Sequence, residues 1–324
     1  MIQEPSRTRE GERRTDMSNI ADLARPPEPA ASKGLRSQGA IGVAFGLGAY
    51  FTWGFLPLYL KAVASVPAVE VLAHRVIWSL LLLAALVVAM RRWQPLVRLA
   101  RDPRTLMLLG LTSLLIGVNW LIYIWAVNSG HVLETSLGYF INPLVNVALG
   151  VLVLRERLRK AQIGAVSLAA LGVAILAIAQ GSLPWISLAL AFSFSLYGLI
   201  RKMAPADPLT GLLAETALLA PVALVYLAMI GGGSFAAGSL SIDLLLILSG
   251  VVTAAPLLMF AAAGKRLRYA TLGLLQYIAP TIQFLLAVLL FKEELGTAHL
   301  VTFACIWVGL AIYAADAVRV TRRA

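Results

Sequence analysis

The stretch HVLETSLGYFINPLVNVALGVLVL at residues 131–154 decides the fold class, because it is apolar and long enough to cross a bilayer. Its polar and glycine residues recur at every fourth position: Glu134, Gly138, Asn142, Asn146 and Gly150. In a helix, this spacing places them on one face. Lipid does not solvate a carboxylate or an amide, so the face must meet other helices or a wet cavity. The stretch therefore predicts a membrane protein that handles something polar.

The composition of the whole chain also predicts a membrane protein. Hydrophobic residues make up 60% of the chain and charged residues 13%, whereas soluble domains carry about 25% charged residues. The single cysteine, Cys305, excludes an internal disulfide, and His74, His131 and His299 are too far apart in the sequence to predict a metal site. No dinucleotide-binding, Walker A, zinc-protease or serine-hydrolase motif occurs, so no cofactor is expected.

Ten apolar segments each approach the length that spans a bilayer, which predicts an all-α integral membrane protein with ten transmembrane helices. Residues 1–39 are charged and rich in proline, so we expect a disordered arm without a signal peptide. The first span would then act as an uncleaved signal-anchor, with Met1 or Met17 as the start. The predicted segments are 40–60, 69–90, 105–127, 132–154, 161–180, 184–201, 211–230, 242–264, 270–291 and 297–316.

The distribution of Lys and Arg predicts the orientation. If the N-terminus is cytoplasmic, 24 of the 27 basic residues fall in the arm, the cytoplasmic connections and the tail at 317–324. The others are Lys61 and Lys292 in outer loops and Arg75 within a span. This bias follows the positive-inside rule and places both termini in the cytoplasm. Loop charge also explains the net charge of +11, so no nucleic-acid partner is expected.

The chain repeats itself. Residues 143–176 align with 280–313 at a constant offset of 137, with ten of the 34 aligned positions identical. A weaker match sets LAHR at 72–75 against LAET at 213–216. These matches predict two five-helix halves, 40–180 and 184–316. Because five is odd, the halves would insert with opposite orientation, a construction that lets one site open alternately to either side of the membrane.

These features resemble the drug/metabolite transporter superfamily of the EamA type, and more narrowly its RarD (chloramphenicol-sensitive protein) family. The helix-end signature RERL at 155–158 has its counterpart at 292–295. The resemblance implies an inner-membrane permease with a central cavity between the halves, and it does not identify a substrate. It covers most of residues 40–316 and is carried by WGFLPLYLK (53–61), EVLAHRVIWS (70–79), NWLIYIWAVNSGHVLETSLGYFINPLVNV (119–147), LPWISLALAFSFSLYGLIRK (183–202) and ETALLAP (215–221).

Charged residues inside the spans are candidate substrate contacts. Arg75 could bind substrate or a carboxylate, form a structural ion pair, or extend its head to the interface. His74 could pair with Glu70, four residues earlier. By the repeat, Glu215 takes the corresponding place in the second half, so we expect Arg75 and Glu215 to be linked through the central cavity. Glu134 is a further candidate, with hydrogen bonding to the preceding loop as its structural alternative.

Amides and tyrosines complete the predicted substrate site. Asn142 and Asn146 lie deep in their span, where amides can also serve only to hold helices together. Because Asn146 aligns with Gln283, we expect both to face one cavity. Tyr139 and Tyr277 lie next to these polar groups, and Tyr123 is a more ambiguous member of the set.

The sequence therefore predicts a secondary transporter, and not an enzyme, that exports small polar or amphipathic metabolites or drugs by alternating access. Its partners would be a small-molecule substrate and the lipid bilayer, while assembly into a homo-oligomer stays open. The alternatives are an intramembrane enzyme with His74 and Glu215 or Glu134 as acid and base, and a membrane assembly scaffold. The inverted repeat and the lack of a nucleophile–base motif weigh against the enzyme.

Overall fold

The computed structural model describes residues 30–154, 159–264, 266–267 and 275–323, and within these ranges the chain forms helices and no β-strand. The all-α prediction is therefore confirmed for the described residues. Residues 1–41 and 42–324 form two separate units by their internal contacts. All packing described below lies within residues 42–324.

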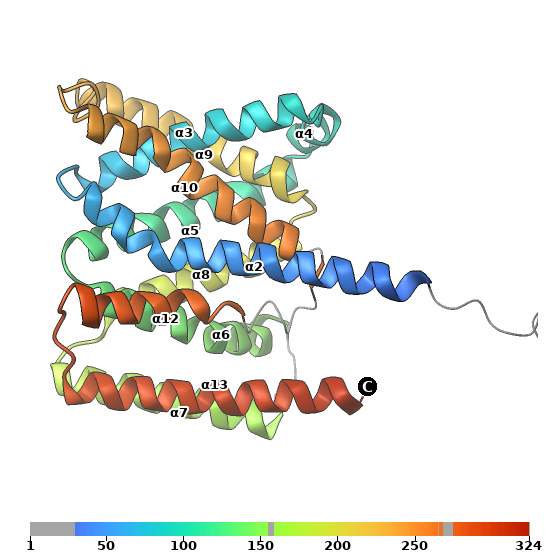
Figure 1. Ribbon diagram of the computed structural model, residues 1–324, viewed down its shortest axis with the longest axis vertical. Coiled ribbons are helices and arrows are strands. Elements are labelled where there is room, and N and C mark those ends of the chain that lie inside the picture. Colours follow the sequence, from blue (N-terminus) through green and yellow to red (C-terminus); the bar gives the residue numbers. More distant parts are fainter. Residues whose placement is uncertain (1–29, 155–158, 265, 268–274, 324) are drawn as a thin grey trace, which may run out of the picture. The chain divides into compact units, whose positions relative to one another are not determined.

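Each predicted apolar segment overlaps a described helix (Figure 1). Six of the described helices are long and apolar enough to cross a membrane, and three shorter apolar ones accompany them. The segment predicted at 270–291 begins outside the described residues. The described helices are α2 (Ala30–Ala62), α3 (Ala68–Ala89), α4 (Trp93–Ala100), α5 (Pro103–Asn128), α6 (Val132–Leu154), α7 (Lys160–Gln180), α8 (Trp185–Met203), α9 (Pro208–Met229), α10 (Leu240–Gly264), α12 (Ile278–Leu285) with the π-helical turn η1 (Leu286–Leu290), and α13 (Thr297–Arg323).

Two features of the structure differ from the sequence-based expectation. Helix α2 begins at Ala30, so the last part of the arm expected to be disordered is helical, and the rest of the arm lies outside the described residues. The short helix α4 lies in the connection between the predicted spans 69–90 and 105–127, where no helix is predicted. Its Leu99 is buried against Leu109, Ala204 and Ala214, and this apolar contact favours a helix over an open loop.

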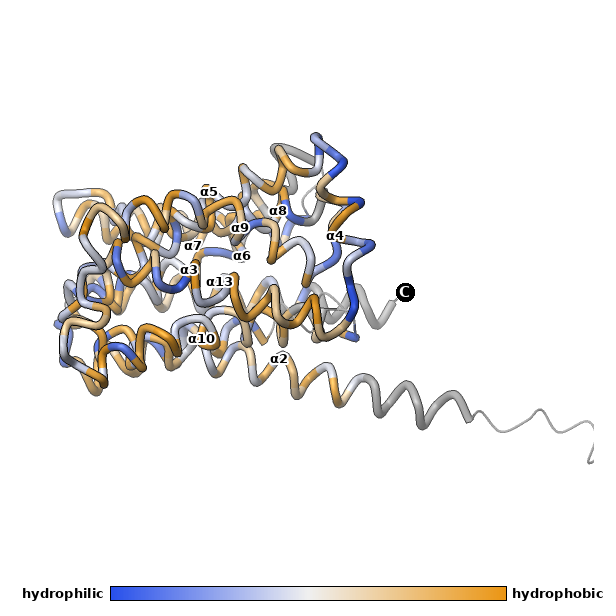
Figure 2. Tube along the Cα trace, turned by 90° about the horizontal axis from the view of Figure 1, so that it is seen from above, coloured by the Kyte–Doolittle hydropathy of each residue, from blue (hydrophilic) through white to orange (hydrophobic). Residues whose placement is uncertain are grey.

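Many large apolar side chains are exposed, as lipid-facing helices require. Ile178 is 81% exposed and Met229 80% exposed, values that would be costly in water. Figure 2 shows hydrophobic residues along most of the described helices and hydrophilic residues around α4. Exposed apolar surface together with helices of membrane-spanning length identifies a multi-pass membrane protein.

Helices α7 and α13 pack side by side along their lengths (Figure 1). A Cβ added at Gly172 would lie 3.2 Å from the carbonyl oxygen of Thr302, and one added at Gly309 would lie 2.9 Å from that of Ala165. Both glycines therefore allow close approach of the two helices. The two contacts are equivalent in the repeat. Gly172 and Gly309 are 137 positions apart in the sequence, which is the repeat offset, and so are Ala165 and Thr302.

Acidic side chains cap several helix N-termini, where backbone N–H groups lack partners. Asp102 accepts from the backbone of Arg104 at 3.1 Å and from the hydroxyl of Thr105 at 2.6 Å. The Thr105 hydrogen bond lowers the pKa of Asp102 below its ordinary value. Glu293 accepts from the backbone N–H groups of Val132 and Leu133, at 2.7 Å each, and so fixes the start of α6 against the segment that follows η1.

Candidate functional site

A cavity of about 100 Å³ lies between helices α2, α3, α5, α6, α8, α10 and α12. It brings together four of the residues predicted as substrate contacts, from four different helices. Aromatic rings form much of its wall, and one charged residue, Arg75, is among the described residues that line it. The lining that matters most below is Arg75, Trp120, Tyr123, Tyr139, Thr253 and Gln283.

Arg75 of α3 lines this cavity and is 3% exposed. Its Nε donates to the hydroxyl of Thr253 on α10 at 2.9 Å. The guanidinium carbon lies 5.1 Å from the centre of the Trp120 ring, a cation–π distance. Its Nη1 is buried and has no hydrogen-bond partner. A buried cation that keeps an unused donor is ready to bind an acceptor.

Tyr123 and Tyr139 form the wall next to Arg75, with ring centres 5.7 Å apart. The hydroxyl of Tyr139 donates to the side-chain oxygen of Asn119 at 3.4 Å. Asn119 in turn donates to α8 through the Leu190 carbonyl at 3.1 Å. The hydroxyl of Tyr123 is buried and has no partner. The two tyrosines therefore differ, since Tyr139 is fixed by a hydrogen-bond chain and Tyr123 retains a free hydroxyl.

Gln283 of α12 lies on the cavity wall contributed by the second half of the chain and is 2% exposed. Its Nε2 donates to the carbonyl of Trp53 on α2 at 3.0 Å. This bond assigns the orientation of the amide and leaves Oε1 as a buried acceptor without a partner. The cavity thus offers unused donors from the first half of the chain and an unused acceptor from the second.

Glu215 does not pair with Arg75, and this expectation was wrong. The carboxylate of Glu215, 2% exposed, lies 3.3 Å from Nε of Arg201 and accepts from the hydroxyl of Thr112 at 2.7 Å. The hydroxyl of Tyr197 is a third donor, at 3.4 Å. Arg201 supplies the counter-charge from the last turn of α8, and its Nη2 also donates to the carbonyl of Asp207 at 3.3 Å. Glu215 lines a separate pocket of about 10 Å³ that shares Ile116 and Trp120 with the cavity.

His74 could pair with Glu70, but the two form no hydrogen bond or salt bridge with each other. Glu70 accepts from the backbone N–H of Ser234 at 2.5 Å and from its hydroxyl at 3.2 Å, so it organises the loop before α10. The imidazole of His74 packs against Phe235 with ring centres 5.2 Å apart. His74 is absent from the cavity lining and has no contact with Glu134 or Glu215 that would make an acid–base pair.

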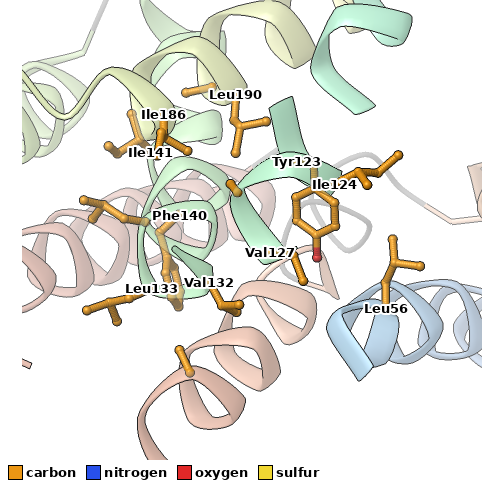
Figure 3. Close-up of a cluster of buried hydrophobic side chains, with 14 of the residues drawn as sticks. Leu56, Tyr123, Ile124, Val127, Val132, Leu133, Phe140, Ile141, Ile186 and Leu190 are labelled. Atoms are coloured by element: carbon orange, nitrogen blue, oxygen red, sulfur yellow. The ribbon is translucent and has the colours of Figure 1, made fainter. Parts of the chain in front are cut away.

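The polar line on α6 is mainly a packing seam against α8. Ser187 donates to the carbonyl of Glu134 at 2.7 Å, and Ser195 donates to the side-chain oxygen of Asn142 at the same distance. Between them, a Cβ at Gly138 would lie 2.8 Å from the Ser187 carbonyl oxygen. Figure 3 shows side chains of both helices in one buried cluster. Glu134 and Asn142 therefore lie outside the cavity lining, and Asn142 holds two helices together.

Asn146 and Tyr277 do not face the cavity, which corrects the expectation drawn from the repeat. Asn146 is exposed, although Gln283 at the aligned position is buried in the wall. Tyr277 stacks on Phe140, with ring centres 6.4 Å apart and planes 16° apart. A turn precedes α12 and a π-helical turn follows it, so the two aligned segments differ locally and aligned residues need not face the same way.

The sequence reasoning missed several residues of the site. Thr253, which binds Arg75, had one available signal: with Asp243 and Ser249, it is one of three polar side chains in its predicted span. Phe194 and Phe260 line the cavity but look like ordinary apolar residues of their helices. Arg201 ends the predicted span 184–201 and falls among the basic residues assigned to the cytoplasmic connections, because nothing in the local sequence separates it from Lys202.

Known proteins resemble this chain over nearly its full length. A model of the EamA-like transporter family matches residues 40–178. Protein RarD of Escherichia coli is 50% identical over 285 residues, covering 87% of this chain and 96% of the relative. An uncharacterized transporter of Pseudomonas aeruginosa is 49% identical over 87% of this chain and 96% of its own length. The chloramphenicol-sensitive protein RarD of the same organism is 33% identical over 87% and 96%.

A solved structure supports the fold independently. It covers 84% of this chain and 96% of its own chain with a TM-score of 0.58 at 20% sequence identity, which shows a shared fold. The sequence relatives, each matched over most of their length, show more than the fold. The chain belongs to the EamA-like transporter family, in its RarD group, and is a multi-pass membrane protein of a bacterial transporter family.

Proposed function

We propose that this protein is a secondary transporter of the bacterial inner membrane that exports a small amphipathic metabolite or drug by alternating access. The observation that carries the proposal is the cavity around Arg75. Helices of both predicted halves contribute to its wall: α2, α3, α5 and α6 from the first half, and α8, α10 and α12 from the second. A polar site between two helical repeats is where such folds bind their cargo.

Two sets of contacts support the inverted five-helix halves, 40–180 and 184–316. The first is the reciprocal packing of Gly172 and Gly309 described above. The second pairs a charge of one half with a threonine of the other: Arg75 binds Thr253, and Glu215 binds Thr112. The two threonines differ by 141 positions, the offset that sets LAHR against LAET. In one contact the charge comes from the first half and the threonine from the second, and in the other contact the roles of the halves are exchanged. A pseudo-twofold axis produces pairs of contacts of this kind.

The proposed topology has ten spans with both termini in the cytoplasm. The six membrane-length helices and three shorter apolar helices supply nine of them, and α6 (Val132–Leu154) supplies the tenth. The arm at 1–39 and the tail at 317–324 would then be cytoplasmic. The basic residues of the connections support this orientation.

The structure supports transport better than it supports either alternative function, an intramembrane enzyme or a membrane assembly scaffold. An intramembrane enzyme would need His74 to act with Glu134 or Glu215, but His74 packs against Phe235 and Glu215 is engaged by Arg201. A scaffold would need no cavity lined by unsatisfied polar groups. The partners that follow from the proposal are a small-molecule substrate and the bilayer, with no nucleic acid, and it leaves self-association open.

The test is a comparison of metabolites in the medium of cells with and without the gene, followed by flux of the enriched compound in proteoliposomes. A transporter moves the compound unchanged, whereas an enzyme alters it and a scaffold does neither. If no compound changes in the medium and none moves in vesicles, the proposal fails.

A matched pair of variants makes the test specific for the cavity. Gln283 and Asn146 occupy aligned positions, but only Gln283 lines the cavity. We expect Gln283→Leu to reduce flux strongly at normal membrane abundance, and Asn146→Leu to leave flux unchanged. Equal loss of flux in both variants would contradict the assigned cavity.

A further inference from the structure

The electrostatic character of the cavity is set by one buried cation. Arg75 donates a hydrogen bond to Thr253 and lies over the face of the Trp120 ring, and no carboxylate among the described residues forms an ion pair with it. Removing a guanidinium from water costs several kcal/mol unless a counter-charge compensates it. The contrast with Glu215 is informative, because that equally buried charge has Arg201 as its counter-ion. Within the described part of the chain, the positive charge at the cavity is therefore uncompensated.

Three buried polar atoms at the cavity lack partners, and they differ in chemistry. Nη1 of Arg75 is a donor, the hydroxyl of Tyr123 can donate or accept, and Oε1 of Gln283 is an acceptor. Arg75 and Tyr123 come from neighbouring helices, α3 and α5, and can donate to one anionic group. Gln283 comes from α12 and can accept from a hydroxyl or amine elsewhere on the same molecule. Unsatisfied buried groups of native proteins call for such an explanation.

The remaining wall is suited to a flat apolar body. Rings of Tyr50, Trp53 and Phe260 contact one another, with Tyr50–Trp53 centres 5.5 Å apart and Trp53–Phe260 centres 5.7 Å apart. Tyr139 and Phe194 form a second pair at 6.0 Å. The cavity measures about 100 Å³, and a protein cavity of ~150 Å³ binds benzene. The space is smaller than that cavity and therefore limits the apolar body to one ring at most.

Two other ligand classes fit less well. Aromatic walls also attract organic cations, but Arg75 would repel a cation in the same cavity. Inorganic dianions are bound by several donors or cations, whereas one charged side chain is available among the described lining residues, and the aromatic wall would be left uncovered.

We propose that the cavity binds an organic anion, a carboxylate or sulfonate head carried on a small aromatic body, with the head on Arg75 and Tyr123 and the ring between the aromatic side chains. The proposal rests on the transport function proposed above and names its substrate class. The simplest alternative is that Thr253 and Trp120 satisfy Arg75 completely and that the guanidinium serves only to hold α3 against α10 and α5.

Four commercial probes test the proposal on the purified full-length protein in detergent, by calorimetric titration. Benzenesulfonate has both the anion and the ring and stays charged, benzenesulfonamide has the ring without the charge, methanesulfonate has the charge without the ring, and benzyltrimethylammonium reverses the charge. We expect benzenesulfonate to bind about tenfold or more tightly than each of the others. Tighter or equal binding of the sulfonamide or the ammonium, or no binding of benzenesulfonate, would overturn the anion site. Equal binding of methanesulfonate would overturn the aromatic body.

Variants of Arg75 test whether this residue binds benzenesulfonate. Arg75→Gln should weaken benzenesulfonate binding about 10- to 100-fold, the loss expected for a hydrogen bond to a charged group. Arg75→Lys should lose less, because it keeps the charge without the guanidinium fork. Arg98→Gln, an exposed arginine on α4, is the control and should bind as the wild type does. Unchanged binding in Arg75→Gln would assign Arg75 the purely structural role. If that variant does not fold, two other measurements test the anion site. Tyr123→Phe should weaken benzenesulfonate binding severalfold, and the four probes can be compared on the wild type.

Flux separates this proposal from the transport function. Vesicles loaded with benzenesulfonate, which crosses lipid poorly, should release it faster with the protein than without it. Binding without flux would leave the anion site intact and refute transport. Flux of benzyltrimethylammonium without binding of benzenesulfonate would support transport and refute the anion site.

Discussion

The Arg201–Glu215 pair is expected to show strong energetic coupling, and a double-mutant cycle measures it. The carboxylate of Glu215 is 2% exposed and the side chain of Arg201 is 17% exposed, with 3.3 Å between the charged groups. Arg201→Gln leaves a buried carboxylate with only the hydroxyls of Thr112 and Tyr197, and we expect a loss of about 3–5 kcal/mol of stability.

The reverse variant should cost less. Glu215→Gln leaves a guanidinium that remains partly accessible, so about 1–3 kcal/mol is expected. The double variant leaves no orphan charge, and its loss should fall short of the sum of the single losses by about 1–3 kcal/mol.

Unfolding in mixed detergent–SDS micelles, followed by circular dichroism, gives the free energies for the cycle. Arg92→Gln is the control: the Arg92–Asp207 pair also ties a basic residue to α9, but the arginine is 37% exposed, so about 0–1 kcal/mol is expected. Additivity of the two variants within about 0.5 kcal/mol would refute the pairing. Arg201→Lys, which keeps the charge, should recover part of the loss.

Two further predictions concern the cap of α6 and the topology. Glu293→Ala should destabilise the protein by about 2–4 kcal/mol, because Glu293 accepts hydrogen bonds from two backbone N–H groups of α6. Glu294 is an exposed neighbour, so Glu294→Ala should have little effect in the same unfolding assay. Equal losses in the two variants would contradict the cap. In a Cys305→Ser background, Ser182→Cys and Ala237→Cys should react with a membrane-impermeant thiol reagent added to intact cells, and Gln94→Cys should not; labelling of Gln94→Cys alone would invert the proposed orientation.

The positions of the helices could be predicted from the sequence because an apolar run of bilayer length is a strong signal. The predicted segment 69–90 and the observed α3, Ala68–Ala89, differ by one residue at each end. The short helix α4 escaped prediction because its stability comes from burying Leu99 against residues far away in the sequence. The segment is amphipathic, but eight residues are too few for a local pattern alone to predict a helix.

The composition of the cavity was less accessible to sequence reasoning, because polar residues inside a span have two physical explanations. Arg75, Tyr123, Tyr139 and Gln283 lie together at the cavity. Asn142 carried the same signal, yet it binds Ser195 of a neighbouring helix. The sequence shows that a polar group must be satisfied, but the rotation of its helix decides whether another helix or a cavity does so.

The two charged sites indicate how a repeated scaffold can carry an asymmetric function. In the proposed repeat, α3 with α10 and α9 with α5 are equivalent pairs, and each joins a charged residue to a threonine. The charges are opposite in sign, however, and their surroundings differ. Glu215 is neutralised by Arg201, so it contributes little to the field in the cavity, whereas Arg75 contributes an uncompensated positive charge. The sign of the charge at the cavity is therefore set by Arg75 in the first half of the chain. Removing Arg201 should have a second effect besides destabilising the protein. It would expose the charge of Glu215 to the cavity beside Trp120, oppose Arg75, and weaken the binding of benzenesulfonate even though Arg201 does not line the cavity.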